Sequence, residues 1–458
     1  MYFRKVSCKL TTGAAIWVLL AGPAIGQDID SPTATKAVGR PADQVVAAVD
    51  SPALKVFLLE VLERNPDLER YRAKAAAAAV RAPQVRALPD PVAMVTAFPL
   101  PPETRVGPQR LSVSLSQRLP GFGKLAARER AAVFAAVGAQ QNWESQRLTV
   151  VTKARELANE WAFSQLRDRI VEEEKHHLVH HEELTRARYS AGLGIQQEVI
   201  KIQAAITRAE QRLLEVRIRQ TELLADLNAL RDRPAITPLG GLELLEPKAL
   251  ALDYEDLVTA SLGLPERASA EAEVERRKAL VDVAQRDFRP EIRLGFDYTV
   301  VERRQDAAGR TVAPQGNGND ILALSAGIEL PLHRKRRSAA LEQALAEQQA
   351  AEAHQRAIEA QIERNLGESR ARLPLLFEQW WLFETVLLKQ AEESLRSAET
   401  AYTTGKLNAL ELFHSEHVLY EVRLGAARAQ ADFAIAWARL EGALGSPWKA
   451  EEVGNEAG

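Results

Sequence analysis

Four segments of the chain alternate large apolar residues with small or polar ones. In residues 111–116 every second residue is leucine or valine, and the residues between them are serines. A period of two places the apolar side chains on one face of a strand and the polar side chains on the other. The alternation predicts four strands, at about residues 92–98, 110–119, 291–300 and 321–330, each close to the length that a tilted membrane strand requires.

Two long stretches have the composition of helices. Residues 124–188 contain no proline and one glycine, Gly138, and are rich in alanine, glutamate, glutamine, arginine and leucine. These residues are strong helix formers, and one helix over residues 121–188 would be about 100 Å long. In the arm that follows, apolar residues recur three and four apart, as in a coiled coil. We expect helical hairpins over residues 121–232, with the turn at 189–194, and over residues 336–444, with the turn at 402–406.

The same order of signals occurs twice along the chain. The first set is Pro66, Pro91, Pro120, Tyr189 with Gly192, and Pro234, and the second is Pro265, Pro290, Pro331, Tyr402 with Gly405, and Pro447. The second set follows the first by 199, 199, 211, 213 and 213 residues, so the register slips by more than one or two residues only once, between the second and third signals. We predict an internal repeat, with copies at residues 51–234 and 256–447 and a linker at 235–255. The expected fold is mainly α, with long antiparallel hairpins joined to a membrane β-barrel.

The N-terminus has the pattern of a signal peptide. Arg4, Lys5 and Lys9 precede an apolar run over residues 13–21, and residues 24–26 (Ala-Ile-Gly) form a small-x-small cleavage site. The run is shorter than the ~20 residues that a spanning helix needs, which leaves a short anchor helix as the weaker alternative. We expect residues 1–26 to be removed on export, residues 27–50 to form an N-terminal extension and residues 448–458 to form a tail.

Charge and cysteine content exclude several classes of function. The formal charge of −3 becomes −6 once residues 1–26, with three cations and no acidic residue, are removed, which argues against nucleic acid as a partner. Cys8, the only cysteine, lies before the apolar run, so it is not the lipid-bearing cysteine of a lipoprotein. The sequence contains no phosphate loop, no Gly-x-Ser-x-Gly and no His-Glu-x-x-His. We expect neither enzymatic activity nor a cofactor.

Six of the eight histidines lie close to the two predicted turns. Those before the first turn form two pairs spaced four apart, and each pair presents two imidazoles on one helix face, as metal sites do. The candidates are His176, His177, His180, His181, His414 and His417. They are candidate metal ligands or elements of a protonation-sensitive gate. The alternative is a solvated polar face, or hydrogen bonding between helices.

Four strands cannot close a membrane barrel. An open sheet in lipid leaves unpaired backbone groups at its edges, each costing roughly several kcal/mol, so we expect the chains to associate. Two chains would supply about 8 strands, a barrel that side chains fill, whereas three would supply about 12. A pore therefore favours a homotrimer. A small soluble sheet packed on helices is the alternative.

The motifs, in their paired order, resemble those of the TolC family of outer-membrane efflux channels. The first copy carries Asn65-Pro66, residues 88–91 (Leu-Pro-Asp-Pro) and residues 114–124 (Ser-Leu-Ser-Gln-Arg-Leu-Pro-Gly-Phe-Gly-Lys). The second carries residues 288–290 (Phe-Arg-Pro) and residues 328–331 (Ile-Glu-Leu-Pro), which run into Arg334-Lys335. The resemblance covers about residues 50–447.

The resemblance implies a trimeric barrel of twelve strands, embedded in the lipid of a Gram-negative-type outer membrane and joined to a periplasmic α-barrel. Such a channel is a passive exit duct for substrates that an inner-membrane pump delivers through a periplasmic adaptor. The adaptor would dock on the tip turns, for which the candidate residues are Tyr189, Gly192, Gly194, Tyr402, Gly405 and Lys406. The Pro-Asp-Pro and Pro-x-x-Gly-Lys patterns resemble the heavy-metal branch, whose pumps are of the resistance-nodulation-division type.

Two alternatives to metal efflux remain open. One is an outlet for multidrug efflux or type I protein secretion, and the other is a coiled-coil spacer of the envelope that transports nothing.

One departure from the repeat affects the helices. Pro374 lies inside the second long helix, where it removes a backbone hydrogen bond and is expected to cause a kink.

Overall fold

The computed structural model describes residues 40–448, except for the side chains of residues 308 and 309. These residues belong to one compact unit that begins at Arg40. The predicted signal peptide at 1–26, residues 27–39 of the predicted extension and residues 449–458 of the predicted tail lie outside the described residues.

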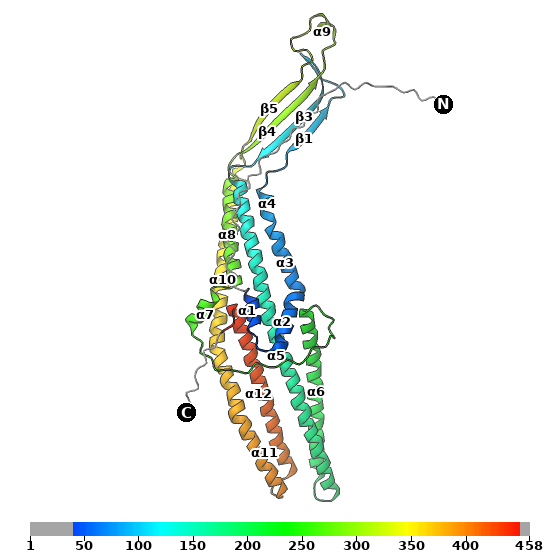
Figure 1. Ribbon diagram of the computed structural model, residues 1–458, viewed down its shortest axis with the longest axis vertical. Coiled ribbons are helices and arrows are strands. Elements are labelled where there is room, and N and C mark those ends of the chain that lie inside the picture. The colour runs from blue at the N-terminus through cyan, green and yellow to red at the C-terminus, as the bar shows by residue number, and fades with distance from the viewer. Residues whose placement is uncertain (1–39, 449–458) are drawn as a thin grey trace, which may run out of the picture. The chain divides into compact units, whose positions relative to one another are not determined.

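Helices make up most of the described chain (Figure 1). They are α1 (Pro41–Ala47), α2 (Pro52–Arg64), α3 (Pro66–Ala79), α4 (Arg81–Arg86), α5 (Lys124–Ser190), α6 (Gln196–Leu230), α7 (Tyr254–Ser261), α8 (Pro265–Arg286), α9 (Ala307–Thr311), α10 (Arg334–Leu382), α11 (Leu388–Thr403) and α12 (Ala409–Leu444). Pro52, Pro66 and Pro265 each occupy the first position of a helix, where the missing N–H leaves no helical carbonyl unpaired. Asn65 caps α3 by accepting a hydrogen bond of 3.2 Å from the backbone N–H of Leu68.

The strands are β1 (Val92–Ala97), β2 (Glu103–Thr104), β3 (Gly107–Leu119), β4 (Glu291–Val301) and β5 (Ile321–Glu329). Four of them form an antiparallel sheet in the order β1-β3-β4-β5, and β2 pairs with β3. Leu115 lies opposite Phe296, which lies opposite Leu324. In another row Ser112 lies opposite Thr299, with the two hydroxyl oxygens 3.1 Å apart. The register therefore separates a largely apolar face from a face rich in hydroxyl and charged groups.

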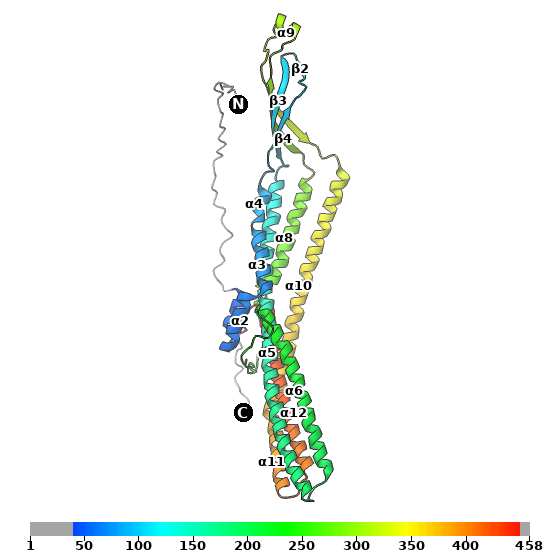
Figure 2. The ribbon, with the colours of Figure 1, turned by 90° about the vertical axis from the view of Figure 1, so that its right-hand side faces the viewer.

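No layer of helices covers β1 or β5, because every residue of these two strands is exposed. Leu322, Leu324 and Ile328 of β5 are 64%, 83% and 65% exposed. The helices continue from the ends of the strands instead of crossing the sheet (Figures 1 and 2). The sheet is therefore not packed on helices in the way that the alternative of a small soluble sheet requires.

Helix α5 is the central element of the helical region. It packs against α6, α8 and α12, while α10 packs against α8 and α12. The largest core lies midway along these helices and contains the buried side chains of Leu58, Leu223, Leu366, Phe433 and Leu440. Among the residues that the structure describes, no helix combines the length and the apolar composition needed to cross a membrane.

The segment between α6 and α7 has no helix or strand of its own and packs against this core. Leu242 and Leu245 contribute side chains to the core cluster. The indole of Trp161 in α5 donates a hydrogen bond of 3.3 Å to the carbonyl of Gly240. The predicted linker at 235–255 is thus a strap across the helices, and its last two residues already belong to α7.

Pro374 lies inside the continuous helix α10, and the kink expected there stays a prediction. Helix α10 continues through Pro374, and the neighbouring Leu373 is fully buried. A change of helix type lies further along, at η1 (Phe383–Leu387), a π-helical segment between α10 and α11. Gly425 of α12 faces it, and a Cβ there would lie 2.4 Å from the ring of Phe383.

We expect Gly442→Ala to weaken the packing of α12 on α5. A Cβ at Gly442 would lie 2.3 Å from Oγ1 and 3.2 Å from Cβ of Thr152. Overpacking costs roughly 1–3 kcal/mol, more than the ~1 kcal/mol that alanine gains over glycine in a helix. Thermal unfolding followed by circular dichroism in detergent should show a lower midpoint.

Gly367→Ala in α10 is the matched control, because a Cβ at that position would meet no atom within 4 Å. This variant keeps the gain in helix propensity without a clash, so its midpoint should stay the same or rise. The same change of midpoint in both variants would contradict close packing at Gly442.

Candidate functional site at the hairpin turns

The two hairpin turns have the same backbone geometry. Gly192 and Gly405 adopt positive φ angles of 73° and 72°, which residues with a Cβ rarely adopt. In the first turn the N–H of Leu193 donates to the carbonyl of Arg188 at 2.9 Å, and in the second the N–H of Lys406 donates to the carbonyl of Ala401 at the same distance. This pattern is the glycine-ended helix cap of the Schellman type.

The turns present their side chains to solvent. Tyr189 is 45% exposed and Leu193 is 72% exposed, and Lys406 is exposed as well. A Cβ on Gly192 or Gly405 would meet no atom within 4 Å, so these glycines serve backbone conformation and not close packing. The role of the turns in docking an adaptor stays a prediction.

A side-chain contact joins the two turns of one chain. The guanidinium of Arg188, at the end of α5, donates a hydrogen bond of 3.1 Å to the hydroxyl of Tyr402 in α11. The same guanidinium lies 5.4 Å from the centre of the Tyr402 ring. A cation over an aromatic face adds an electrostatic attraction. The Tyr-x-x-Gly spacing predicts Tyr402 as a turn residue, but no pattern points to Arg188, because the contact spans two hairpins that are far apart in the chain.

Further from the turns, Glu416 of α12 joins α12 to α5 through two histidines. Its carboxylate lies 2.8 Å from Nδ1 of His177 and 2.7 Å from Nε2 of His181, and its side chain is only 8% exposed. The hydrogen bond to Glu416 raises the pKa of His181 against the opposing effect of burial, and the charge of Glu399 adds to the rise.

Glu174 of α5 joins three helices in a second cluster. Its carboxylate lies 3.0 Å from Nδ1 of His417 in α12 and 2.8 Å from Arg212 in α6, and its side chain is 2% exposed. The hydrogen bond to Glu174 raises the pKa of His417 against burial, with a smaller contribution from Glu421. Burial opposes ionisation of Glu174, but the hydrogen bonds from His417 and Arg212 outweigh it and lower the pKa of Glu174.

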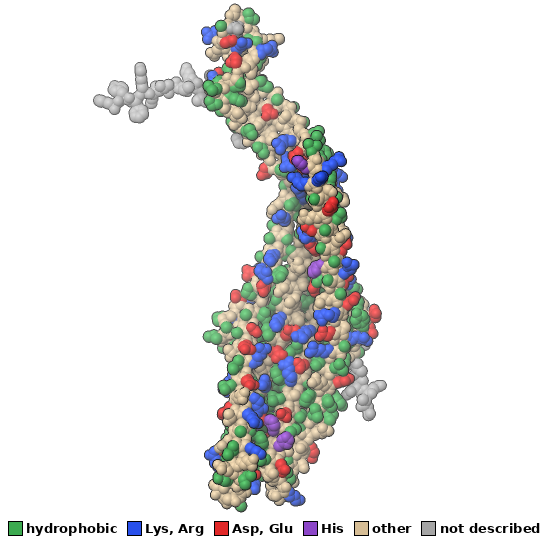
Figure 3. Space-filling view, turned by 180° about the vertical axis from the view of Figure 1, so that it is seen from behind, with side chains coloured by type: hydrophobic (Ala, Val, Ile, Leu, Met, Phe, Trp, Pro, Cys, Tyr) green, Lys and Arg blue, Asp and Glu red, His purple; other side chains and the backbone are tan. Residues whose placement is uncertain are grey.

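We call these two groups the histidine–carboxylate clusters: Glu416 with His177 and His181, and Glu174 with His417 and Arg212. The other three candidate histidines, His176, His180 and His414, are exposed. Figure 3 shows histidines among charged side chains near the hairpin end. Among the described residues, no group of three or more histidine, cysteine, aspartate or glutamate side chains is arranged to hold a metal ion. The clusters match the alternative of hydrogen bonding between helices.

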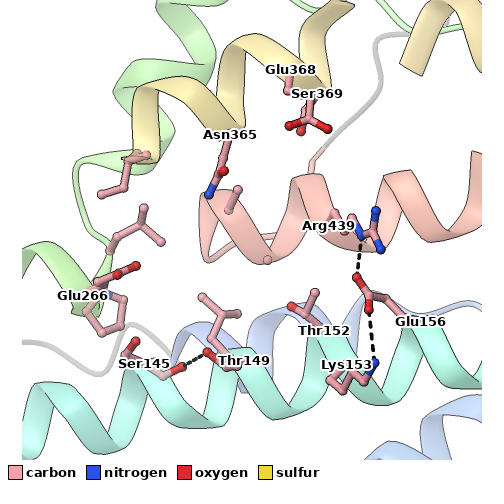
Figure 4. Close-up of a pocket in the computed structure, with 16 residues that line it drawn as sticks. Ser145, Thr149, Thr152, Lys153, Glu156, Glu266, Asn365, Glu368, Ser369 and Arg439 are labelled. Atoms are coloured by element: carbon pink, nitrogen blue, oxygen red, sulfur yellow. Dashed lines mark hydrogen bonds and ion pairs between the residues drawn. The ribbon is translucent and has the colours of Figure 1, made fainter. Parts of the chain in front are cut away.

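Polar side chains also converge in a hollow lined by α5, α8, α10 and α12 (Figure 4). Glu156 lines it from α5, 2.5 Å from Arg439 and 3.9 Å from Lys153. Asn365 and Glu368 line it from α10. Glu368 itself pairs with Arg364 and Arg372 of its own helix. Because these charges pair with one another, the hollow is a weaker candidate site than the hairpin ends.

Comparison with known proteins supports one class of molecule. Residues 262–446 match the model of the family described as "Outer membrane efflux protein". The comparison with curated protein sequences finds no significant match.

Three solved outer-membrane proteins, two of them described as channels, share the fold. VceC of Vibrio cholerae has a TM-score of 0.70 at 20% identity, over 86% of this chain and 97% of VceC. CmeC of Campylobacter jejuni has a TM-score of 0.74 at 13% identity, over 88% of each chain. MtrE of Neisseria gonorrhoeae, solved in an open state, has a TM-score of 0.70 at 19% identity, over 86% of this chain and 89% of MtrE.

These comparisons confirm that the chain is similar to outer-membrane efflux channels in its fold and in the sequence of its second half. The outer-membrane location expected from the sequence agrees with all of them. The expected link to a heavy-metal branch stays a prediction.

We expect the two hairpins of a chain to separate as the pH rises. The pKa values of His181 and His417 are raised in the folded protein. Their stabilisation is therefore fully present below the ordinary imidazole pKa of ~6.5 and is lost as the pH rises through the raised values. Spin labels at Ser190→Cys and Thr404→Cys, in chains diluted with unlabelled protein, should report longer and broader distances at high pH.

His176→Gln/His180→Gln is the control, because both side chains are exposed and neither lies in a histidine–carboxylate cluster. This variant should keep the response to pH, whereas His181→Gln/His417→Gln should lose it. Equal distances at low and high pH in the unsubstituted protein would refute the role of the clusters.

Proposed function

We propose that three copies of the chain close a twelve-stranded barrel that serves as a passive exit duct across the outer membrane. The observation that carries the proposal is the open sheet, whose edge strands β1 and β5 are exposed along their whole length. In lipid those edges need partners, and a second and third copy supply them in register. Three sheets of four long strands leave an aqueous interior that two sheets would not.

The two faces of the sheet support this arrangement. One face of β3 and β4 carries hydroxyl and charged side chains, which would line the interior of the barrel. They are Ser112, Ser114, Asp297 and Thr299. The opposite face carries the cross-strand row of Leu115, Phe296 and Leu324, which would face the lipid. Apolar side chains outside and polar side chains inside are the pattern of a membrane barrel with a water-filled channel.

The helical hairpins would continue the duct on the periplasmic side. Their turns lie at the end of the helices that is remote from the sheet (Figure 1). Exposed residues of both turns, with Tyr189 and Lys406 among them, would contact a periplasmic adaptor, and an inner-membrane pump would supply the cargo. The matching backbone geometry of the two turns supports this, because one adaptor surface could bind either hairpin.

Heavy-metal cations are the cargo class that we propose. The exposed imidazoles of His176, His180 and His414 favour it, since they lie near the hairpin turns and are not held in the histidine–carboxylate clusters. They offer weak, transient contacts and not a closed binding site. Multidrug efflux, type I protein secretion and a non-transporting spacer remain the outcomes against which this proposal is tested.

Single-channel recording in a planar bilayer tests the duct. We expect the unsubstituted protein to conduct, and Arg188→Ala to conduct more, because this substitution releases the contact between the two turns. Arg186→Ala is the matched control, since Arg186 pairs with Glu182 one turn earlier in its own helix. Absence of conductance in all three proteins would favour the spacer.

Deletion of the gene tests the cargo. The proposal predicts greater sensitivity to copper, zinc, cobalt or nickel, and restoration of tolerance by the unsubstituted gene. Substitution of His176, His180 and His414 by glutamine should lower the restored tolerance. Sensitivity to drugs alone would point to multidrug efflux, and loss of a secreted protein alone would point to type I secretion.

A further inference from the structure

The junction between β5 and α10 carries an unusual concentration of positive charge. Residues 330–341 contain four lysine or arginine residues and no acidic residue. Leu332, His333, Arg334, Lys335 and Arg336 line one shallow hollow, and all five are exposed. Figure 3 shows lysine and arginine side chains gathered at the level where the sheet meets the helices. We call Arg289, Arg334, Lys335, Arg336 and Arg337 the basic collar.

The cations of the basic collar have no carboxylate partner among the described residues. Arg337 donates to the carbonyls of Asp287 and His333, at 2.7 and 3.4 Å, and Arg289 donates to the carbonyl of Phe122 at 2.9 Å. All three bonds end on backbone carbonyls, so neither guanidinium gains an anionic partner from them. Further along the helices the pattern differs, as Arg276 and Arg277 both pair with Glu273.

The apolar face of β5 leads directly to the collar. Leu322, Leu324 and Ile328 on this face are followed at the same spacing by Leu330 and Leu332, which are 62% and 79% exposed. Arg334 begins α10 two residues after Leu332. An apolar strip that ends in a cluster of cations fits the boundary between the hydrocarbon of a bilayer and its headgroups.

Phe122 marks the same level on the neighbouring part of the chain. It lies between β3 and α5 and is 80% exposed. An exposed aromatic ring beside cations is typical of the interfacial zone of a membrane, where the ring contacts acyl chains and the cations contact phosphates.

A second copy of the chain is a poorer partner for these charges. In the proposed trimer β5 pairs with β1 of the next chain, so the segment that precedes β1 would lie beside the collar. Residues 81–91 of that segment contain Arg81 and Arg86 and only one acidic residue, Asp90. Arg86 pairs with Glu129 of its own chain, and Asp90 balances the charge of Arg81. The neighbouring chain therefore brings no excess of acidic residues that would neutralise the collar.

We propose that the basic collar binds the headgroups of anionic phospholipids in the periplasmic leaflet of the outer membrane. The inference rests on the proposed function, because it requires the sheet to span that membrane. The cations would hold lipid phosphates at the end of the lipid-facing strip, and so fix the depth at which the barrel lies in the bilayer.

Native mass spectrometry of the detergent-solubilised protein tests the proposal, with phosphatidylglycerol and phosphatidylcholine offered at equal concentration. We expect phosphatidylglycerol to bind at least tenfold more tightly to the unsubstituted protein, and less tightly as ionic strength rises. In Arg334→Gln/Lys335→Gln/Arg336→Gln this preference should be lost, since each cation near a membrane surface contributes about a factor of five and three together exceed the tenfold preference.

Lys201→Gln/Arg208→Gln/Arg217→Gln is the matched control, because it removes three exposed cations from α6, which has no contact with the sheet. This variant should keep the preference for phosphatidylglycerol. Equal binding of the two lipids to the unsubstituted protein, or loss of the preference in both triple variants, would overturn the proposal. If inorganic phosphate at the same concentration displaces the lipid completely, the collar is a site for free anions and the proposal is likewise wrong.

Conductance measured on the same samples distinguishes failure of the collar proposal from failure of the duct proposal. The collar variant should remain oligomeric and conducting, because its substitutions leave the strands and the turns unchanged. Loss of lipid preference with conductance intact supports the collar, whereas absence of conductance in the unsubstituted protein refutes the duct. If the collar variant does not fold, the salt dependence and lipid preference of the unsubstituted protein still decide the matter.

Discussion

The unpaired edges of the sheet are the constraint on which the rest of the molecule depends. β1 and β5 each pair on one side only, and every residue in both is exposed. An unpaired backbone N–H or carbonyl in lipid costs roughly several kcal/mol, so a membrane sheet with two free edges is stable only when further strands complete it. The strand order also sets the order of the helices, because α4 precedes β1, α5 follows β3, α8 precedes β4 and α10 follows β5.

Different interactions stabilise the sheet and the region near the hairpin turns. At the sheet, backbone hydrogen bonds and the separation of apolar and polar faces do not depend on pH near neutrality. Near the hairpin turns, the contacts between α5 and α12 pass through His177, His181 and His417, which face buried carboxylates. The pKa values of His181 and His417 are raised by these contacts, so the contacts of these two histidines weaken as the pH rises, while the sheet is unaffected. A duct that opens at one end needs this division.

Local patterns in the sequence were sufficient to predict the strands and the helix ends. The strict alternation at residues 111–116 lies within β3, because a period of two has one simple structural solution. Gly192 and Gly405 end helices with positive φ, as the Tyr-x-x-Gly spacing indicated. The π-helical segment at Phe383–Leu387 was not predictable, since it has no proline or glycine to mark it in the sequence. The partners Glu416, Glu174 and Arg212 were not predictable either, because they lie on helices that only the fold brings together.

The number of chains in the membrane form tests the account most directly. Native mass spectrometry of the protein in detergent would count them, since about twelve strands require three sheets of four. The account predicts a mass of three chains and the loss of β-structure, seen by infrared spectroscopy, when the assembly is dissociated. A single chain that keeps its sheet in detergent would contradict it.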